Sequence, residues 1–334
     1  MSGVPREWRR WAAESTLMEV ETEEIARTLQ RHDFDADGEV AELESHPYLE
    51  AGDWIAQRLR KLESMLDILS QLSSLTEPAR TIPRRQALTP QDLLREYYAT
   101  NRPLVIDGLV DEWPARHRWT PAYLASVCGD VMVDVMDGRE GESAREQYVN
   151  GRVRAMRFGS YVDMVMSAGS TNRFYLVGTN DFLQRPEVSP LWQDIGSLGG
   201  YLDPCQKVAG SSLWFGPAGT ITPLHHDLMN ILLAQVIGRK KIVLIPPTET
   251  HLVYNELGLF SEVDVEWPDL ERFPRFARTT PATIVLEPGQ VLFLPVGWWH
   301  HVRSLDVSIS VSFTNFIYPN DYRWRNPRID RSPR

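Results

Sequence analysis

The stretch TPLHHDLMNILLAQVIG, at residues 222–238, places polar residues directly before an apolar run, and our expectations for the fold begin there. Its polar residues are His225, His226 and Asp227, and the apolar run after them is typical of a buried strand. Polar groups that enter an apolar core need partners, because burying them alone costs free energy. Residues two apart in a strand project to one face, so His225 and Asp227 share a face and His226 projects away. The stretch predicts either a buried His–Asp hydrogen bond or part of a metal site.

Short β-prone runs separated by turn residues occupy the chain from residue 103 onward. These runs are PLVID, VMVDVM, RFYLVG, SSLWFG, NILLAQVIG, KKIVLIPP, ATIVLE, QVLFLP and DVSISVSFTNF. The last run alternates serines with apolar residues, from Val307 to Phe313 and then Asn315, and EPGQ at 287–290 is a good hairpin turn. Many short strands with few long helices between them favour an antiparallel sandwich or barrel. The predicted fold is therefore mainly β with flanking helices.

Residues 1–80 form a different region, which lacks β-rich runs and is predicted to be helical. Its clearest helix spans residues 53–75, where apolar residues recur at alternating spacings of four and three. The stripe consists of Ile55, Leu59, Leu62, Leu66 and Leu69. A stripe of this kind needs a cover, either from the rest of the chain or from the same helix in a second copy. Both packing and homodimerisation through residues 53–75 stay open.

A proline-containing stretch, TEPARTIPRRQALTP at residues 76–90, separates the helical region from the β-rich region. No apolar period runs through it, so it is predicted to be a linker or an extended arm. Thr89 and Thr120 are each followed by proline, and both are predicted to be helix N-caps with the proline at the first helical position.

Composition and charge limit the classes of function. The chain has 334 residues, of which 43% are hydrophobic and 24% are charged, as is ordinary for a globular protein. No apolar run is long enough for a membrane span, and the N-terminus lacks the continuous apolar segment of a signal peptide. The net charge of -10 disfavours nucleic-acid binding, although the tail at 322–334 carries five arginines. Cys128 and Cys205 lie far apart without a CxxC pattern, so a reducing, cytoplasmic location is expected.

A second histidine-bearing segment, LFLPVGWWHHVRS at residues 292–304, continues another apolar run. Two histidines and one carboxylate on one side of a metal form the facial triad of non-haem Fe(II) oxygenases, which leaves the other coordination positions open. With His225 and Asp227 as two members, either His300 or His301 supplies the missing imidazole. An isolated HxD pattern is weak evidence, and tryptophans before a histidine also occur as core packing. The metal site is therefore predicted from the combination of the two segments.

These segments together resemble a known family. TPLHHDLMNILLAQVIGRKKIVLIPP, followed by LFLPVGWWHHVRSL and a strand ending in Asn315, is similar to the JmjC/cupin-like Fe(II)- and 2-oxoglutarate-dependent oxygenases, in particular the asparaginyl hydroxylase branch. The resemblance covers about residues 85–318. It implies a double-stranded β-helix, which is the jelly-roll or cupin core, as the catalytic domain. It also implies His225, Asp227 and His300 as iron ligands, since the family's ligand directly follows the tryptophan pair.

The resemblance further implies a pocket for the co-substrate 2-oxoglutarate. The family holds the distal carboxylate with a basic residue on the strand after HxD, and Lys240, fifteen residues after His225, matches that place better than its basic neighbours. A buried ammonium is costly without an anion, and a dicarboxylate supplies one. Thr222 and Tyr175 resemble the hydroxyl donors to the same carboxylate. Asn230 and Asn315 resemble the amides that line the pocket.

The resemblance implies that the chain uses Fe(II), 2-oxoglutarate and O2 to hydroxylate an amino-acid side chain in a protein or peptide, releasing succinate and CO2. Demethylation follows the same path when the attacked carbon bears nitrogen. Other targets that stay open are a free amino acid, a small natural product and a modified tRNA base; a non-catalytic cupin scaffold is the alternative without turnover. We expect an N-terminal helical region at 1–80, a catalytic domain at 85–318 and a basic tail at 319–334.

Overall fold

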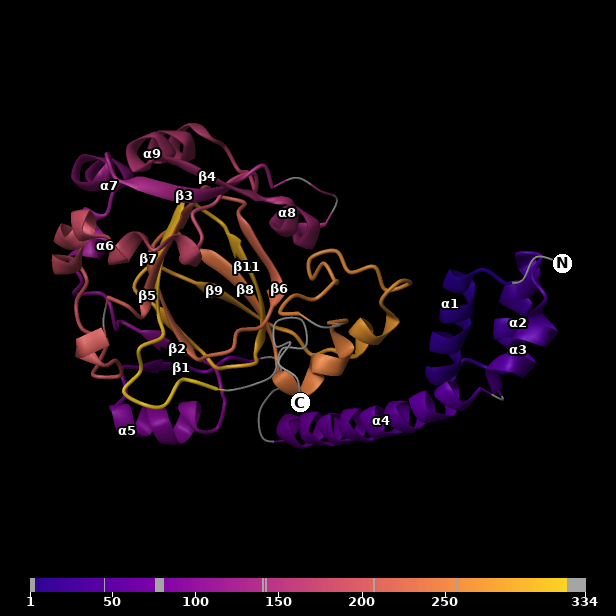
Figure 1. Cartoon of the computed structure of the whole chain (residues 1–334). Helices are drawn as coiled ribbons and strands as arrows, with labels where there is room; N and C mark the ends of the chain where they lie inside the picture. The colour runs from indigo at the N-terminus through magenta and orange to yellow at the C-terminus, as the bar shows by residue number, and fades with distance from the viewer. Residues whose placement is uncertain are drawn as a thin grey trace. The chain divides into compact units, whose positions relative to one another are not determined.

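The β-rich region folds as two sheets with an apolar interior between them (Figure 1). The computed structural model describes residues 4–44, 46–75, 81–139, 141, 143–206, 208–255 and 258–322. The chain divides into two compact units, residues 1–72 and 73–334. The second unit contains both sheets and every residue that the sequence predicts for the metal site and the co-substrate pocket.

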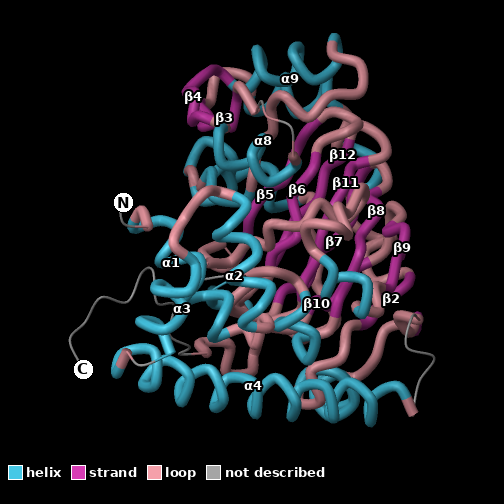
Figure 2. The backbone as a smooth tube through the Cα atoms, turned by 90° about the vertical axis from the view of Figure 1, so that its right-hand side faces the viewer, coloured by secondary structure: helices cyan, strands magenta, loops and turns pink. Residues whose placement is uncertain are grey.

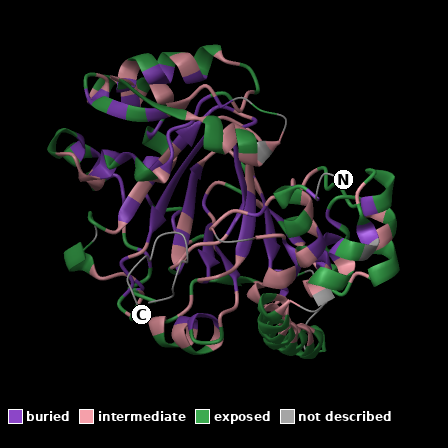
Figure 3. Ribbon diagram, turned by 45° about the vertical axis from the view of Figure 1, so that its right-hand side comes forward, coloured by how far each residue is buried: buried purple, intermediate pink, exposed green. Residues whose placement is uncertain are grey.

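One sheet has six strands in the order β1-β2-β10-β7-β12-β5. Their bounds are β1 Arg84–Gln86, β2 Leu104–Asp107, β5 Ser211–Gly216, β7 Ile231–Ile237, β10 Val291–Leu294 and β12 Ser308–Phe313. All neighbours pair antiparallel except β1 and β2, which are parallel. The strands at the centre of this sheet are buried along nearly their whole length (Figure 3). Burial on both faces explains why β7 and β10 have almost continuous apolar sequences.

The other sheet has four antiparallel strands in the order β6-β11-β8-β9. Their bounds are β6 Ile221–His225, β8 Lys240–Ile245, β9 Ala282–Leu286 and β11 Trp299–Ser304. The predicted turn at 287–290 is present between β9 and β10, and Gly289 takes a φ of 100° there. The turn is not a hairpin, however, because β9 and β10 belong to different sheets, so the chain crosses from one sheet to the other at this point.

Apolar side chains of both sheets meet between them. Figure 2 shows the backbone of the strands of both sheets. Val105 and Leu292 come from the six-stranded sheet, and Ile242, Leu244 and Ala282 come from the four-stranded sheet. Two packed antiparallel sheets with strands that alternate between them are the architecture of a jelly roll. The predicted fold class, a mainly β jelly-roll core with flanking helices, is confirmed.

Strand β12 shows the predicted alternation, but neither of its faces meets solvent. Ile309 and Val311 pack in the cluster that joins the six-stranded sheet to the surrounding helices. The serines point the other way and are satisfied: Ser310 Oγ donates to Gln235 Oε1 at 2.7 Å. The strand ends at Phe313, so the residues after it lie beyond the regular sheet.

Helices and a small sheet surround the core in the same unit. The helices are α5 Pro90–Leu93, α6 Ala115–Arg118, α7 Pro121–Cys128, α8 Ala144–Asn150 and α9 Phe158–Ser167. Thr89 and Thr120 are N-caps, as predicted: the hydroxyl of each accepts a hydrogen bond of 3.1 Å from a backbone N–H in the first turn. The run VMVDVM forms β3, Met132–Asp137, which pairs with β4, Arg152–Arg157, in a separate two-stranded sheet. The run RFYLVG is not a named strand and makes only isolated bridges.

The N-terminal unit is helical, as predicted. Its helices are α1 Arg6–Leu17, α2 Thr22–Arg31, α3 Ala36–Glu44 and α4 Pro47–Ser74. The first three enclose a small core that includes Ala12, Ile25 and Leu29. Helix α4 contains the predicted stripe, and large apolar side chains along it are exposed (Figure 3). These side chains are Trp54, Ile55, Leu59, Leu62, Met65, Ile68, Leu69 and Leu72.

The predicted linker at 76–90 is partly a strand. Residues 84–86 pair with β2, so this part of the stretch belongs to the sheet and is not a free arm. Residues 76–80, and the tail from residue 323 onward, lie outside the described residues. None of the helices that the structure describes combines the length and the hydrophobicity needed to cross a bilayer.

Candidate metal centre

Strands β6 and β11 bring the predicted iron ligands together. His225 ends β6 and lies directly opposite His300 near the start of β11, with their ring centroids 4.0 Å apart. The Nε2 atom of His300 lies 3.4 Å from Asp227 Oδ2. One ligand atom from each of His225, Asp227 and His300 lies within 4.8 Å of the other two. The three groups therefore surround one point, which is the arrangement that a shared metal ion requires.

Both imidazoles are oriented by their own strands. His225 Nδ1 lies 2.8 Å from the carbonyl of Pro223, and His300 Nδ1 lies 3.0 Å from the carbonyl of Trp298. Because a carbonyl only accepts, each Nδ1 is the protonated nitrogen, and each Nε2 keeps its lone pair for a metal. Burial, together with the neighbouring His225, lowers the pKa of His300 to about 3, so this ring is neutral at neutral pH. A neutral imidazole is the form that binds a metal.

Asp227 lies just beyond the end of β6, in the turn toward β7, and not in the strand as the spacing rule assumed. Its backbone carbonyl accepts a hydrogen bond of 3.1 Å from Gly297 N, which ties this turn to the one before β11. Gly297 has a φ of 79°, a conformation that residues with a Cβ rarely adopt. The carboxylate is partly exposed while both histidines are buried, so the open side of the centre is the side of Asp227.

A β-bulge in β6 determines which side chains share the inner face of the sheet. His225 pairs with His300 and Thr222 pairs with Val302, so three steps along β6 match two steps along β11. Strict alternation would place Thr222 and His225 on opposite faces. The extra residue brings both to the face that Val302 shares with the interior, since paired residues project to the same side. Thr222 thus lies on the face of the metal ligands, as the resemblance requires.

Lys240 is the first residue of β8, and its side chain points into the interior with 2% of its surface exposed. Its Nζ makes a hydrogen bond of 3.2 Å with the hydroxyl of Tyr175, which is also buried. Burial lowers the pKa of Lys240 to about 7. Its basic neighbours point outward: Arg239 pairs with Asp306, while Lys241 lies 3.7 Å from a carboxylate oxygen of Glu266. Of the three cations in the sequence GRKK, only Lys240 enters the interior.

Lys240 lies at a suitable distance from the triad for a co-substrate between them. Along β11, His300 pairs with Leu244 and Ser304 pairs with Lys240, so four residues, or about 13 Å of strand, separate the two rows. The lysine side chain and a bound five-carbon dicarboxylate together can span that gap. The structure therefore brings Lys240, Tyr175 and Thr222 onto one interior, with the metal ligands at its open end.

The two predicted amides have other partners. Asn230 is engaged through both polar atoms of its side chain: Oδ1 accepts from Val296 N at 2.8 Å, and Nδ2 donates to Asn320 Oδ1 at 3.1 Å. The Nδ2 of Asn315 donates to the carbonyl of Asp203 at 2.9 Å, outside the regular sheet. Both amides connect loops in the structure, and their place in the co-substrate pocket stays a prediction.

The second histidine of each pair projects away from the triad, as expected. His226 packs edge-on against Trp299 with ring centroids 4.6 Å apart. His301 is buried on the other face of β11, where its Nε2 lies 3.8 Å from Glu266 Oε2. Alternation along β11 separates the ligand His300 from His301, whereas His226 lies just beyond the end of β6.

Three residues near the centre were not anticipated from the sequence. Phe260 stacks on His225 at 5.3 Å between ring centroids, and Tyr148 of α8 lies 5.0 Å from Phe260. Arg139, which follows β3, is buried with its guanidinium 5.3 Å from the ring of Tyr148 and 5.9 Å from that of Tyr175. They reach the site from loops and a short helix, so neither strand alternation nor motif spacing could have found them.

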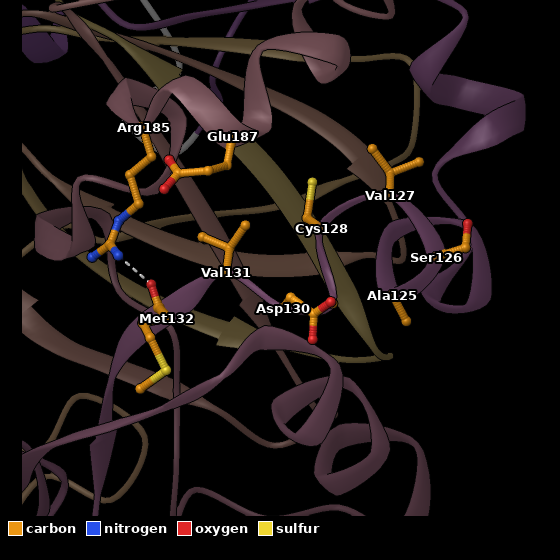
Figure 4. A pocket seen from close by; sticks show the side chains of 10 residues that line it. Ala125, Ser126, Val127, Cys128, Asp130, Val131, Met132, Arg185 and Glu187 are labelled. Atoms are coloured by element: carbon orange, nitrogen blue, oxygen red, sulfur yellow. Dashed lines mark hydrogen bonds between the residues drawn. The ribbon is translucent and has the colours of Figure 1, made fainter.

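A cavity of about 470 Å³ lies elsewhere, between the end of α7, the start of β3 and residues 185–187 (Figure 4). Cys128 faces it, and Arg185 donates a hydrogen bond to the carbonyl of Met132 at its edge. Burial raises the pKa of the Cys128 thiol to about 11, so the group stays protonated and is a poor nucleophile or metal ligand. None of the triad residues lines this cavity.

The donor set fits ferrous iron. Two nitrogen donors and one carboxylate on one side of a centre, with the other side open, match the facial triad of non-haem iron oxygenases, whereas structural zinc prefers four protein ligands. A centre of this kind on a jelly-roll core is the arrangement of a cupin-type metal-binding protein.

Comparison with known families agrees with this class. Residues 90–319 match the family model described as "Cupin-like domain". The chain belongs to the JmjC/cupin-like family, whose members use Fe(II) and 2-oxoglutarate. The predicted family is thereby confirmed, while the asparaginyl hydroxylase branch stays a prediction.

Curated relatives share this domain. The chain is 34% identical over 238 residues to "Lysine-specific demethylase 8" of Xenopus tropicalis, covering 70% of this chain and 52% of the relative. It is 31% identical over 254 residues to "Lysine-specific demethylase JMJ30" of Arabidopsis thaliana, covering 74% and 57%. It is 29% identical over 253 residues to "HSPB1-associated protein 1" of Bos taurus, covering 69% and 51%. The chain thus spans little more than half the length of these relatives.

Proposed function

We propose that this chain is an Fe(II)- and 2-oxoglutarate-dependent dioxygenase that hydroxylates an amino-acid side chain in a protein or peptide. The observation that carries the proposal is the convergence of His225, Asp227 and His300 on one point with both Nε2 lone pairs free. When bound, the iron supplies oxygen activation coupled to the oxidative decarboxylation of 2-oxoglutarate to succinate and CO2. The chain's own residues hold the metal, orient the co-substrate and limit the access of water.

The interior supports the co-substrate part of the proposal. Lys240 and Tyr175 offer an ammonium and a hydroxyl at hydrogen-bond distance from each other, and Thr222 offers a second hydroxyl on the same face of the sheet. A carboxylate that accepts hydrogen bonds from these groups would restore the charge of Lys240, because an adjacent anion opposes the lowering of its pKa by burial. Binding then fixes one end of the dicarboxylate and leaves its 2-oxo acid end toward the metal ligands.

A macromolecular substrate fits the charge of the chain and the names of its relatives. The net charge of -10 favours a basic partner at long range, and Asp227 marks an open side of the centre. Two relatives are named as lysine-specific demethylases, so demethylation of a lysine side chain is the second candidate. Hydroxylation and demethylation both begin with attack on a C–H bond. They differ in whether the attacked carbon bears nitrogen.

Succinate formation tests the proposal. The protein is loaded with Fe(II) and 2-oxoglutarate without oxygen, then exposed to oxygen in the presence of peptide, amino-acid and RNA pools. Asp227→Ala is expected to abolish metal binding and succinate release, because two imidazoles alone leave the centre incomplete. His226→Gln changes the adjacent residue, which projects away from the centre, and serves as the matched control. Full succinate release by His225→Ala or Asp227→Ala would refute the assignment; formaldehyde in place of a stable hydroxyl would establish demethylation.

We also propose that a second copy of the chain covers the apolar face of α4. The exposed apolar side chains span about half of the helix circumference over more than five turns, and the helix alone cannot bury them. Leu62 and Leu69 lie near the middle of this face and are 60% and 51% exposed. A face of this breadth and period can pair with its own antiparallel copy, as in a coiled coil.

Light scattering tests this surface. Leu62→Glu together with Leu69→Glu is expected to convert a dimer to a monomer, while Ser64→Glu, on the opposite side of the helix, leaves the mass unchanged. A wild-type protein that is monomeric at micromolar concentration would contradict the proposal.

A further inference from the structure

Arg139 is a buried cation that the predicted mechanism does not use. It is 3% exposed and follows Gly138, which has a φ of 67° at the end of β3. Its Nη2 donates to the backbone carbonyl of Ile221, the first residue of β6. Its Nε and Nη1 atoms are buried and have no hydrogen-bond partner among the residues that the structure describes. Burying a guanidinium with two unpaired donors costs free energy, so this site favours the binding of a hydrogen-bond acceptor.

The position of Arg139 connects it to the co-substrate pocket. The carbonyl that it binds immediately precedes Thr222, and its guanidinium lies 5.9 Å from the ring of Tyr175. Lys240 donates to the hydroxyl of that same tyrosine. Arg139 and Lys240 thus approach Tyr175 from different elements, β3 and β8, and the structure pairs neither cation with a carboxylate among the described residues.

Resting on the proposed function, we propose that Arg139 is a further binding residue for the dicarboxylate co-substrate, and that with Lys240 it forms a two-cation pocket around Tyr175 for the carboxylate farther from the metal. The pocket then takes 2-oxo diacids and discriminates against 2-oxo acids that end in a methyl group. Arginine suits this task because its charge persists where burial would neutralise a lysine.

The chemistry of the two cations differs in a way that makes both useful. Burial lowers the pKa of Lys240 to about 7, so the free ammonium is only partly protonated at neutral pH. Burial lowers the pKa of Arg139 to about 10, which leaves the guanidinium charged. Arg139 therefore attracts the anion first, and the bound anion then favours the charged form of Lys240.

A main-substrate carboxylate is the rival ligand for Arg139. The guanidinium also lies 5.3 Å from the ring of Tyr148, which contacts Phe260, and Phe260 stacks on His225, so these contacts connect Arg139 to a metal ligand as well. The contact with the strand that carries Thr222 favours the co-substrate. The two ligands are separable, because the co-substrate can be titrated alone.

Calorimetric titration of the Zn(II)-loaded full chain, in which no turnover occurs, tests the proposal. Arg139→Gln is expected to weaken 2-oxoglutarate binding by about tenfold to a hundredfold, because it removes charged hydrogen bonds. Binding of 2-oxopentanoate, which has a methyl group in place of the second carboxylate, is expected to stay within about twofold of the wild-type value, since it makes no such bond. Arg139→Lys is expected to restore part of the affinity for 2-oxoglutarate alone. Arg173→Gln, an exposed arginine of a neighbouring loop whose Nε lies 3.9 Å from Asp137, is the matched control.

The wild-type protein provides a second measurement that does not depend on a variant folding. The Nε–H resonance of Arg139 is expected to shift on addition of 2-oxoglutarate and not on addition of 2-oxopentanoate. An unchanged resonance, an equal loss of both ligands in Arg139→Gln, or unaltered 2-oxoglutarate binding in that variant would overturn the proposal. Failure of the wild-type, Zn(II)-loaded protein to bind 2-oxoglutarate at all would instead refute the proposed function itself.

Discussion

The inner and outer faces of strands β8 and β11 carry the same types of residue and give them different surroundings. His300 and Lys240 point into the jelly roll, where each Nε2 or Nζ is directed toward a shared interior. His301 and Lys241 point outward, where both lie within 4 Å of one carboxylate, that of Glu266. Among the described residues Lys240 has a hydroxyl partner but no carboxylate partner, whereas Lys241 and His301 share the carboxylate of Glu266. Neighbouring residues of one type thus acquire opposite roles from the period of the strand alone.

On the outer face, Arg303, Lys241 and His301 gather around the carboxylate of Glu266. Arg303 binds Glu266 through Nε at 2.8 Å. Burial alone would raise the pKa of Glu266, but the hydrogen bonds from Arg303 and the nearby charges lower it. Arg303 and Lys241 each have the carboxylate of Glu266 beside them, while burial lowers the pKa of His301 to about 4 and its Nε2 makes no hydrogen bond among the described residues. On the inner face Lys240 has only a hydroxyl partner among the described residues, and His225, Asp227 and His300 converge on one point, so we infer that ligands complete this face.

The largest effect is expected when each of the two histidines, His300 and His301, is replaced separately. His300→Ala is expected to weaken metal binding by more than about a hundredfold, because it removes one of three ligands. His301→Ala is expected to keep metal binding and to lower the free energy of unfolding by about 1–3 kcal/mol, as truncation of a buried side chain does. Metal titration measures the metal affinity of both variants, and denaturant unfolding measures their free energies of unfolding. An equal loss of metal affinity in the two variants would contradict the assignment of different roles to the inner and outer faces.

The two lysines provide the next test. Lys240→Met keeps the length of the side chain without its charge, and we expect the apparent affinity for 2-oxoglutarate to fall by about tenfold to a hundredfold. Lys241→Met removes only an outward ion pair and is expected to leave the affinity unchanged, since pairs of this kind contribute little. Co-substrate dependence of succinate release, or direct binding to the Zn(II)-loaded protein, measures both. An effect in Lys241→Met as large as in Lys240→Met would contradict the assignment.

The pH dependence of stability follows from the same lysine. The pKa of Lys240 falls from an ordinary value near 10.5 to about 7 on folding, so between these values the unfolded chain binds more protons than the folded one. Stability of the ligand-free protein therefore rises with pH across this window, by up to about 1.4 kcal/mol per pH unit from this group. Lys240→Met is expected to flatten that slope between pH 7.5 and about 9.5 in urea unfolding. A slope identical in wild type and variant would mean that the ammonium is solvated.

Thr222→Val gives the smallest expected effect. It removes one hydroxyl from the inner face while keeping the β-branched shape, so 2-oxoglutarate affinity is expected to fall by about threefold to tenfold. Thr283→Val changes an exposed threonine on β9 and is the control. An unchanged affinity in Thr222→Val would show that the bulge in β6 does not serve the co-substrate.

Much of the core and the triad could be predicted from the sequence, because alternation assigns faces within a strand. HxD and WWHH together indicated His225, Asp227 and either His300 or His301, and the family resemblance selected His300. The β-prone runs predicted most strands of the core but not β1, β6 or β11. Alternation alone would place Thr222 and His225 on opposite faces, since nothing in TPLHH indicates the extra residue of a bulge. The turn at 287–290 looked like a hairpin because local residues specify a turn but not which sheet follows it.

Loop residues were the least predictable part of the site. Arg139 follows a glycine in a polar stretch and reads as a surface residue, and only the tertiary fold buries it against Tyr175. Asn230 reads as a pocket amide next to HxD, yet the segment around Asn320 folds back to hydrogen-bond with it. Contacts between elements distant in the sequence decided both.

The carbonyl contacts of the two imidazoles have a consequence for the order of assembly. Each ring is held by the residue two positions before it on its own strand, Pro223 for His225 and Trp298 for His300, so the rings are aimed as soon as β6 and β11 pair. We therefore expect the metal to bind a scaffold that is already folded, unlike a zinc finger, which folds only with its ion. We expect that removal of the metal by a chelator leaves the chain folded and able to bind metal again. Exchange of one divalent ion for another should then require no refolding.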